Sequence, residues 1–343
     1  MKAGRIHAYH EPITIDDVDE PQVNSESDVI VKIGGAGVCR TDLHIVDEIW
    51  KDALNQPSLP YVIGHENAGW VEATGSAVKH LKKGDPIILH PLMSCGICPP
   101  CRAGKDMYCV NGHFPGLDGT DGGYAQYLKT SIRSVVPLAP GTDPVPLAPF
   151  ADAGITAYHA VKKLIALCYP GSHIAVVGIG GLGHFAVQLL HILTPATIIA
   201  VDTQKSRLQF AEEMGAHFTV LAGSDGGKAG VRAIAKDGVD VVVDFVGEHN
   251  TPRTSIEMLT KGGTYSVVGY GGMINIPTLD FVNREINITG NLVGTYTELA
   301  ELMELHRQGR IAITATQFPL ADAPQVMAML ERGEITGRAV LVP

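Results

Sequence analysis

The sequence has few aromatic and charged residues, which make up 6% and 18% of its 343 residues. It also lacks any apolar run of about 18 residues, the length that a membrane span needs. Hydrophobic residues make up 45%, and 39 glycines and 21 prolines provide many turns. This composition excludes a disordered chain and a coiled coil. The length predicts two domains, or one large domain.

Basic residues are in the minority, with 26 Lys and Arg against 36 Asp and Glu and a formal net charge of -10. Because no basic cluster is present, we do not expect nucleic acid or an anionic membrane surface as a partner. The amino terminus, Met1 to His7, quickly becomes polar and has no apolar core of the kind that a signal peptide needs. We therefore expect a cytoplasmic protein.

The pattern of the chain changes near Ile155. Before it, short β-like runs such as 28–33 and 86–90 are separated by glycine and proline. After it, strand candidates alternate with helical patterns, which is typical of a parallel sheet covered by helices. The expected strands are 174–177, 197–201, 239–243 and 264–268. A helix at 298–308 and a strand at 338–342 are expected to return the chain to the first domain.

A glycine-rich turn follows the first of these strands. Gly178, Gly180 and Gly183 match the G-x-G-x-x-G pattern of dinucleotide sites. The next residues carry an apolar stripe at helical spacing up to Pro195, and a second helix is expected from Ser206 to Gly215. The glycines allow a tight turn and a close approach of a pyrophosphate to the helix N-terminus.

The expected second strand ends at Asp202, 19 residues after Gly183. A carboxylate there accepts hydrogen bonds from the adenosine ribose and repels a 2′-phosphate, which favours NAD over NADP. Lys205 and Arg207 follow and weaken that preference. The alternative is a glycine-rich turn without a cofactor, in which Asp202 caps the next helix.

Four of the six cysteines, Cys95, Cys98, Cys101 and Cys109, fall in one short segment with the spacing C-x2-C-x2-C-x7-C. Four thiolates can close a tetrahedral shell around Zn²⁺ without an open position, which indicates a structural site. An iron–sulfur cluster is one alternative and a pair of disulfides is another. Cys168 is expected to be a plain thiol.

A second metal site is suggested by two glycine-flanked segments. Residues 37–44 contain Cys39, Asp42 and His44, and residues 64–69 contain His65 and Glu66. Each alone has an ordinary structural explanation, because single cysteines are often core residues and single histidines often form structural hydrogen bonds. Beside a dinucleotide domain, they suggest metal-assisted hydride transfer.

The ordered motifs resemble those of the zinc-dependent alcohol dehydrogenases of the medium-chain dehydrogenase/reductase family. The likeness runs from end to end and is closest to bacterial secondary-alcohol dehydrogenases. The matching segments are 39–42, 64–66, the segment 95–109 with its four cysteines (the cysteine lobe), 152–156, the glycine turn with Asp202, and Gly337-Arg338. The resemblance implies an α/β fold with a β-rich GroES-like catalytic domain at 1–153 and 289–343. It implies a Rossmann domain, a doubly wound parallel sheet, at 154–288.

The resemblance also implies two zinc ions and roles for individual residues. Cys39, His65 and Asp152 match the ligands of the catalytic zinc. Asp152 stands where many members have cysteine, and since both carry one negative charge, the site stays formally neutral. Glu66 matches a carboxylate that can approach the zinc, and Asp42 matches the residue that orients the ligand histidine.

Further roles concern the substrate and the cofactor. Thr41 corresponds to the hydroxyl that contacts the substrate oxygen, and His44 to the outer end of a proton relay. The residues expected to contact the cofactor are Arg40, Thr156, Gly178, Gly180, Gly181, Leu182, Gly183, Asp202, Arg207, Val246, Val268, Val293 and Arg338. Trp50, Leu92 and Leu117 are candidates for the substrate pocket, with ordinary packing as the alternative.

The implied activity is NAD-dependent interconversion of a primary or secondary alcohol with its aldehyde or ketone, by a homotetramer. Polyol and amino-alcohol dehydrogenases share this scaffold and are alternative functions. A zinc-independent quinone or enoyl reductase lacks this ligand set. A protein that binds NAD and zinc without catalysis is an alternative of another class, and the Thr41 and His44 relay argues against it.

Overall fold

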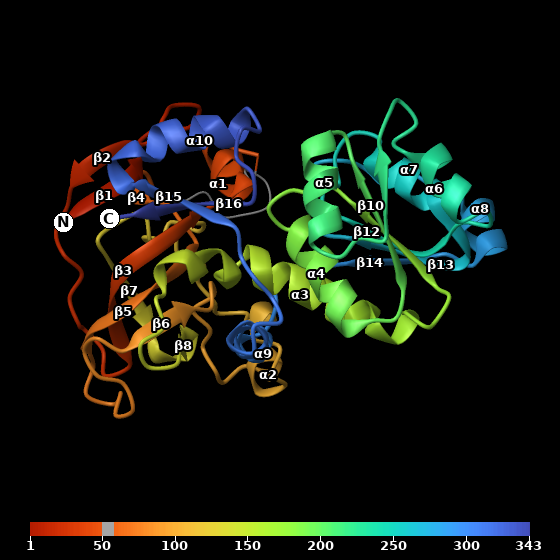
Figure 1. Ribbon diagram of the computed structural model, residues 1–343. Helices are drawn as coiled ribbons and strands as arrows, with labels where there is room; N and C mark the ends of the chain where they lie inside the picture. Colours follow the sequence, from red (N-terminus) through yellow and green to blue (C-terminus); the bar gives the residue numbers. More distant parts are fainter. Residues whose placement is uncertain (50–57) are drawn as a thin grey trace. The chain divides into compact units, whose positions relative to one another are not determined.

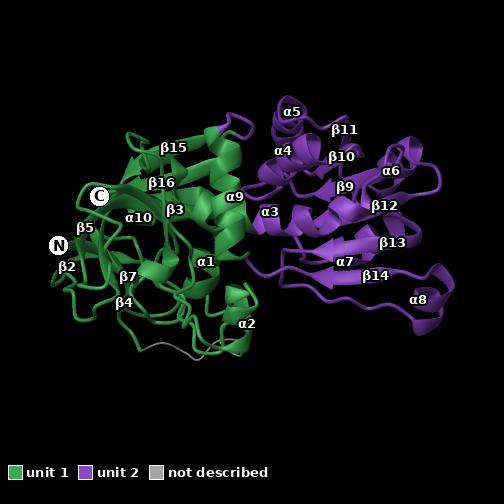
Figure 2. Cartoon of the chain, turned by 90° about the horizontal axis from the view of Figure 1, so that it is seen from below, with its two compact units in different colours: residues 1–155, 294–307, 312–343 green, residues 156–293, 308–311 purple. Residues whose placement is uncertain are grey.

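The computed structural model describes residues 1–49 and 58–343. Trp50, one of the pocket candidates, lies outside the described residues. The chain divides into two compact units (Figure 2), the first made of residues 1–155, 294–307 and 312–343 and the second of residues 156–293 and 308–311. Within the described ranges, every helix is too short or too polar to cross a membrane.

The first unit is rich in β structure. Its strands are β1 (Lys2–Ile6), β2 (Thr14–Asp17), β3 (Asp28–Val38), β4 (Tyr61–Val62), β5 (Glu66–Thr74), β6 (Pro86–Leu89), β7 (Tyr127–Ser131), β8 (Val135–Pro137), β15 (Ala315–Pro319) and β16 (Arg338–Val342). One sheet has the order β2-β1-β4, and the other has the order β15-β16-β3-β5-β6-β8 with β7 also paired to β3. The long strand β3 thus forms the centre of the larger sheet.

The helices of the first unit differ in length, from four residues in α2 to 12 in α9. They are α1 (Arg40–Val46), α2 (Pro99–Arg102), α9 (Tyr296–Arg307) and α10 (Ala323–Glu331), with 3-10 turns η1 (Asp106–Tyr108), η2 (Ile132–Ser134), η3 (Val145–Ala151) and η5 (Leu320–Asp322). The core includes Val29 and Val31 of β3, Ile87 of β6 and Leu341 of β16, all fully or almost fully buried. Burial of alternate β3 residues on this core explains why a β-branched run folds as a strand.

The second unit is a parallel sheet whose successive strands are connected by helices (Figure 1). The helix α3 (Ala153–Leu164) leads the chain into it. The remaining elements are η4 (Ile165–Leu167), β9 (His173–Val177), α4 (Gly183–Leu193), β10 (Thr197–Asp202), α5 (Lys205–Glu213), β11 (Phe218–Leu221), α6 (Lys228–Ile234), β12 (Val239–Asp244), α7 (Thr251–Met258), β13 (Leu259–Val267), α8 (Thr278–Arg284) and β14 (Asn287–Gly290).

The strand order β11-β10-β9-β12-β13-β14, all parallel, is that of the Rossmann fold. The order reverses between β9 and β12, and ligands of such sheets bind at the carboxyl ends of the strands at this point. All four strands that we expected in this domain are present, and β13 begins five residues before the expected start. The expected α/β class with a Rossmann domain is therefore confirmed.

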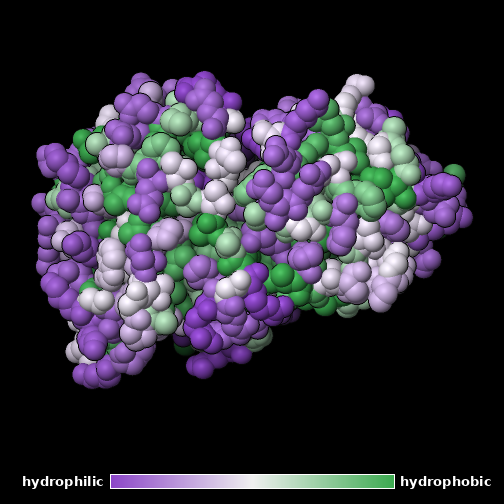
Figure 3. Space-filling view, in the orientation of Figure 1, coloured by the Kyte–Doolittle hydropathy of each residue, from purple (hydrophilic) through white to green (hydrophobic). Residues whose placement is uncertain are grey.

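The surface is mixed in character. On the face shown in Figure 3, hydrophobic residues are interspersed among hydrophilic ones. Exposed large apolar residues do occur in the second unit, including Met273 and Leu279. Such residues are normal on folded proteins, where apolar atoms contribute much of the accessible surface.

Candidate active site

Strand pairing in the first unit brings distant parts of the chain together. Antiparallel pairing of β3 with β5 places Gly37 opposite Glu66, so the turn after β3 lies beside the start of β5. Pairing of β16 with β3 places Ala339 opposite Val38. Cys39 directly follows the end of β3, His65 directly precedes β5, and Arg338 is the first residue of β16. The sheet therefore gathers them at one edge.

Four potential metal donors meet there. One side-chain atom from each of Cys39, His65, Glu66 and Asp152 lies within 4.8 Å of the other three, and none of these residues is more than 9% exposed. Asp152 follows η3 directly and precedes α3, so a different part of the chain supplies it. The Nε2 atom of His65 is buried without a hydrogen-bond partner of acceptable geometry, although Asp152 Oδ2 lies 3.4 Å away.

An orphaned imidazole nitrogen beside a thiol and two carboxylates is suited to binding a cation. Burial lowers the pKa of His65, but the negative charge of Asp42 and the nearby carboxylate of Asp152 outweigh this effect, so the pKa lies well above its ordinary value. The same charges that attract a proton would attract a metal ion. The thiol, imidazole and carboxylate donors fit Zn²⁺, which accepts all three ligand types.

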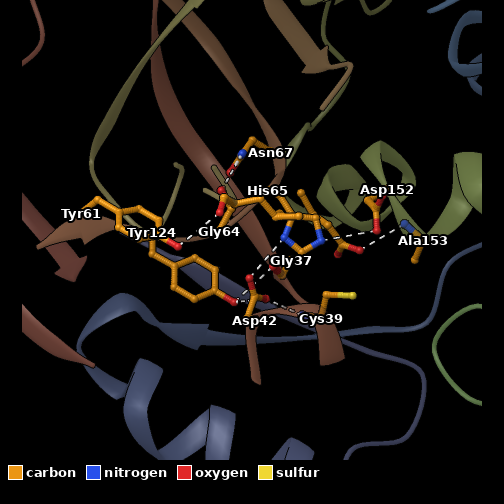
Figure 4. Close-up of polar contacts among 12 residues, drawn as sticks. Gly37, Cys39, Asp42, Tyr61, Gly64, His65, Asn67, Tyr124, Asp152 and Ala153 are labelled. Carbon is orange, nitrogen blue, oxygen red and sulfur yellow. Dashed lines mark hydrogen bonds and ion pairs between the residues drawn. The ribbon is translucent and has the colours of Figure 1, made fainter. Parts of the chain in front are cut away.

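Asp42 fixes the other side of the His65 ring (Figure 4). His65 Nδ1 lies 3.2 Å from Asp42 Oδ1, and because a carboxylate accepts, this nitrogen donates its proton. Nε2, on the opposite side of the ring, then lies near Cys39 and Asp152. Phe114, which no motif pointed to, packs edge-on against the His65 ring with 5.9 Å between ring centroids.

Glu66 is completely buried and has partners of its own. Its Oε1 accepts a hydrogen bond of 3.1 Å from Ala153 N, and its Oε2 forms an ion pair with Arg338 Nη2. Burial raises the pKa of Glu66, and the positive charge of Arg338 opposes this effect. Arg338, which the resemblance places at the pyrophosphate of the cofactor, is only 4% exposed and is held by Glu66. Its phosphate contact stays a prediction.

Helix α1 carries the other residues expected around this site. Arg40 is its first residue and is exposed, Thr41 is half-buried, and His44 lies one turn further along. His44 is 8% exposed, which is less open than we expected for the outer end of a relay. The helix start is fixed by Asp42, whose Oδ2 accepts a 2.9 Å hydrogen bond from Cys39 N.

The four lobe cysteines also converge, with one sulfur from each within 4.8 Å of the others, and all are free thiols. Cys98 Sγ lies 3.4 Å from Cys101 Sγ and 3.9 Å from Cys109 Sγ. Sulfurs at the corners of a tetrahedron around zinc, with Zn–S bonds of about 2.3 Å, lie roughly 3.8 Å apart. The spacing thus fits a shared metal ion and is far too long for disulfides, whose S–S bond is about 2.05 Å.

Backbone N–H groups point at these sulfurs. Cys95 N donates to Cys109 Sγ over 3.2 Å, and backbone hydrogen bonds from Ile97 and Cys98 lower the pKa of Cys95 to about 6. By contrast, burial raises the pKa of Cys101 to about 12. Backbone donors stabilise thiolates, which are the form that binds metal.

The glycine turn of the second unit lies between β9 and α4, at the position where the strand order reverses. A Cβ on Gly183 would lie 2.0 Å from the carbonyl oxygen of Gly178, and one on Gly178 would lie 2.6 Å from a methyl of Val246. A Cβ on Gly180 would meet nothing within 4 Å, so space remains in front of that residue. Two glycines are thus required by packing, and the third leaves room for a ligand.

Asp202 contacts this turn directly. Its Oδ2 accepts a 2.7 Å hydrogen bond from Ile179 N, and its Oδ1 accepts one of 2.9 Å from Gln204 N. Arg207 Nη1 lies 3.8 Å from Oδ2. Asp202 therefore contacts both the residue before α5 and the turn where a cofactor would bind, but it is not the cap of α5 that the alternative explanation supposed, because the N-cap residue is Gln204. His184, which no motif singled out, donates from Nδ1 to Gly180 O over 3.0 Å.

The remaining cofactor candidates are spread over the second unit. Thr156 is buried in α3, while Gly181 and Leu182 form the half-buried end of the turn. Val246 N donates to Asp244 Oδ1, and Val268 N donates to Asp244 O. Val293 has a φ of 48°, which is unusual for a β-branched residue and often marks functional sites.

The two described pocket candidates differ. Leu117 is 6% exposed and belongs to the hydrophobic core of the first unit, which favours ordinary packing. Leu92 is half-buried, and its carbonyl accepts hydrogen bonds from Ser134 and His90.

Comparison with known proteins identifies the family. Residues 25–140 match the alcohol dehydrogenase GroES-like domain, and residues 181–308 match the zinc-binding dehydrogenase domain. The crystal structure of the alcohol dehydrogenase from Aeropyrum pernix is 47% identical, covers 100% of both chains and has a TM-score of 0.97.

Two curated relatives also span nearly the whole chain. A NAD-dependent alcohol dehydrogenase of Sulfolobus acidocaldarius is 33% identical over 99% of both proteins. A D-arabinose 1-dehydrogenase (NADP(+)) of Saccharolobus solfataricus is 32% identical over 100% of this chain and 97% of its own. The chain therefore belongs to the zinc-type alcohol dehydrogenases of the medium-chain dehydrogenase/reductase family, enzymes that interconvert alcohols with aldehydes or ketones.

Proposed function

We propose that this enzyme oxidises a primary or secondary alcohol with NAD, and that Cys39, His65 and Asp152 hold its catalytic zinc. The observation that carries this proposal is the convergence of four buried donor residues, Cys39, His65, Glu66 and Asp152, together with the orphaned Nε2 of His65. A Cys thiolate, an Asp carboxylate and a neutral His would make the site neutral with Zn²⁺. The ion would supply a Lewis acid that lowers the pKa of an alcohol hydroxyl.

The chain's own residues hold and move the proton. Asp42 keeps the His65 Nδ1 protonated, which leaves Nε2 as the donor toward the site. Thr41 and His44, three residues apart on α1, would accept the hydroxyl proton and pass it outward. Glu66, held between Ala153 N and Arg338, adds a second carboxylate beside His65.

We assign nucleotide binding to the second unit and zinc binding to the first, with domain boundaries close to residues 153 and 288. We further propose that Cys95, Cys98, Cys101 and Cys109 hold a structural zinc, so that each chain contains two zinc ions. A homotetrameric state and a cytoplasmic location stay predictions, and gel filtration with light scattering tests the first.

A panel of alcohols tests the substrate class. NAD and NADP reduction would be measured with primary, secondary, aromatic and polyhydroxy alcohols. We expect simple primary or secondary alcohols to give the highest kcat/KM. A clear preference for polyols or amino alcohols, which the D-arabinose dehydrogenase relative keeps as an alternative, would replace that assignment.

Asp202 should set the cofactor preference. In Asp202→Asn the size of the side chain is kept but its charge is lost, so repulsion of the 2′-phosphate and the bond to the ribose both weaken. We expect the ratio of kcat/KM for NAD to that for NADP to fall by about ten-fold or more, because this is the effect of losing one hydrogen bond to a charged group.

Asp240→Asn is the matched control for this change. Asp240 accepts hydrogen bonds from Tyr169 and from His173 N at the amino end of β9, away from the glycine turn. Asp240→Asn should leave the ratio of kcat/KM for NAD to that for NADP unchanged. An equal ratio in wild type and Asp202→Asn would remove Asp202 from cofactor selection.

Asp152 should be the third zinc ligand. We expect Asp152→Ala to lose one zinc per chain, and Asp152→Cys to retain it, because a thiolate restores the same charge. Zinc would be counted by atomic absorption after dialysis. The control is Asp143→Ala, since Asp143 is exposed and bonds only to the nearby Val145 N among the described contacts. Full zinc retention in Asp152→Ala would show that the shell closes without this residue.

A further inference from the structure

Tyr124 is a buried residue close to the proposed catalytic site to which no motif gave a role. It lies just before β7 and is 0% exposed. Its hydroxyl donates to Asp42 Oδ2 over 2.8 Å and lies 3.4 Å from Gly37 O (Figure 4). A fully buried tyrosine hydroxyl needs such a partner, but the choice of Asp42 links Tyr124 to the metal site.

The hydrogen bonds of Asp42 divide between its two oxygens. Oδ2 accepts from Cys39 N and from the Tyr124 hydroxyl, while Oδ1 lies 3.2 Å from His65 Nδ1. Two donors on one oxygen fix the rotation of the carboxylate. The remaining oxygen is thereby aimed at the histidine.

The ring of Tyr124 also contacts the chain next to His65. Gly64 has a φ of 99°, and a Cβ on it would lie 2.2 Å from Tyr124 Cδ1, so the ring lies directly against this glycine. Tyr124 N donates to Ile63 O over 3.0 Å. Tyr124 thus holds both Asp42 and the segment that carries His65.

We infer that Tyr124 is a positioning residue of the catalytic metal site, whose hydroxyl fixes Asp42 and, through it, the tautomer and orientation of His65. This inference rests on the proposed zinc site. Outer partners of metal-binding histidines typically contribute 10- to 100-fold to metal affinity. Because Tyr124 acts through Asp42, its effect should fall near the lower end of that range.

Tyr124→Phe tests the inference, since it removes one oxygen and keeps the ring against Gly64. We expect release of the catalytic zinc to a chelator to become about ten-fold faster, while release from the cysteine lobe stays unchanged. In the cobalt-substituted enzyme, the visible spectrum should shift. kcat should fall without a change in KM for NAD, and thermal unfolding shows whether the fold is intact.

Tyr61→Phe is the matched control. Tyr61 is 2% exposed, and its hydroxyl lies 3.4 Å from Leu117 O instead of contacting Asp42. This variant should release zinc at the wild-type rate. If the loss of any buried hydroxyl nearby accelerates release equally, Tyr124 has no specific role.

Asp42→Asn provides a second route, alone and combined with Tyr124→Phe. If Tyr124 acts through Asp42, the double variant should release zinc hardly faster than Asp42→Asn. The inference would be overturned if the effects of the two substitutions on the zinc release rate multiplied in the double variant. It would also be overturned if Tyr124→Phe released zinc at a rate within two-fold of the wild-type rate. His65→Ala separates the two claims: if it keeps all its zinc, the proposed site itself is wrong, whatever Tyr124 does.

Discussion

His65→Ala should lose one zinc per chain and nearly all alcohol oxidation. The substitution removes the buried Nε2 around which the thiol and carboxylates converge, leaving an incomplete shell. Zinc contributes several kcal/mol to such reactions, so we expect kcat/KM to fall by about 1,000-fold or more. Zinc content and initial rates would be measured on the same preparation.

The controls for this variant address folding and histidine content. His80→Ala removes an exposed histidine of the same unit and should leave both zinc and rate unchanged. His65→Asn keeps a polar side chain and should be as inactive as His65→Ala. The lobe zinc should remain in all three. An active His65→Ala enzyme that lacks the second zinc would contradict the proposed mechanism.

Cys98→Ser should destabilise the cysteine lobe. Cys98 Sγ is close to two other thiols and accepts backbone hydrogen bonds from Cys101 and Val110, which lower its pKa. A serine hydroxyl is a poor zinc ligand, so the metal should be lost and, with it, the folding free energy that a structural zinc supplies. We expect the melting temperature to fall by on the order of 10 °C.

Cys168→Ser is the matched control, because Cys168 is half-buried in the second unit, where burial raises the pKa of its thiol to about 11. It should keep both zinc ions and the wild-type melting temperature. If the purified protein contained iron and showed the visible absorption of an iron–sulfur cluster, the four cysteines would be assigned to such a cluster instead of zinc. Unchanged zinc content in Cys98→Ser would show that this thiol is not a ligand.

The elements with continuous apolar patterns could be predicted from the sequence. The four central strands of the second unit and the glycine turn have such patterns, and the structure places them as expected. The sequence pattern does not predict the edge strands β11 and β14, because they are short and have partly exposed residues without a continuous apolar run. Edge strands lack a neighbour on one side and need less apolar surface.

The donor residues of the proposed metal site could be predicted from the sequence, but their surroundings could not. Spacing and residue type identified Cys39, His65 and the lobe cysteines. The contacts of Arg338 with Glu66 depend on the registers of β16 and β5 with β3, which link residues far apart in sequence. Likewise, nothing in the sequence separates Tyr124 from other buried tyrosines, since its role follows only from the 2.8 Å contact with Asp42.

Anomalous diffraction at the zinc edge from crystals of the purified enzyme tests the central claim most directly. The account predicts two peaks per chain, one among the four lobe cysteines and one enclosed by Cys39 Sγ, His65 Nε2 and Asp152. A peak in the lobe alone, with active enzyme and no metal beside His65, would contradict it.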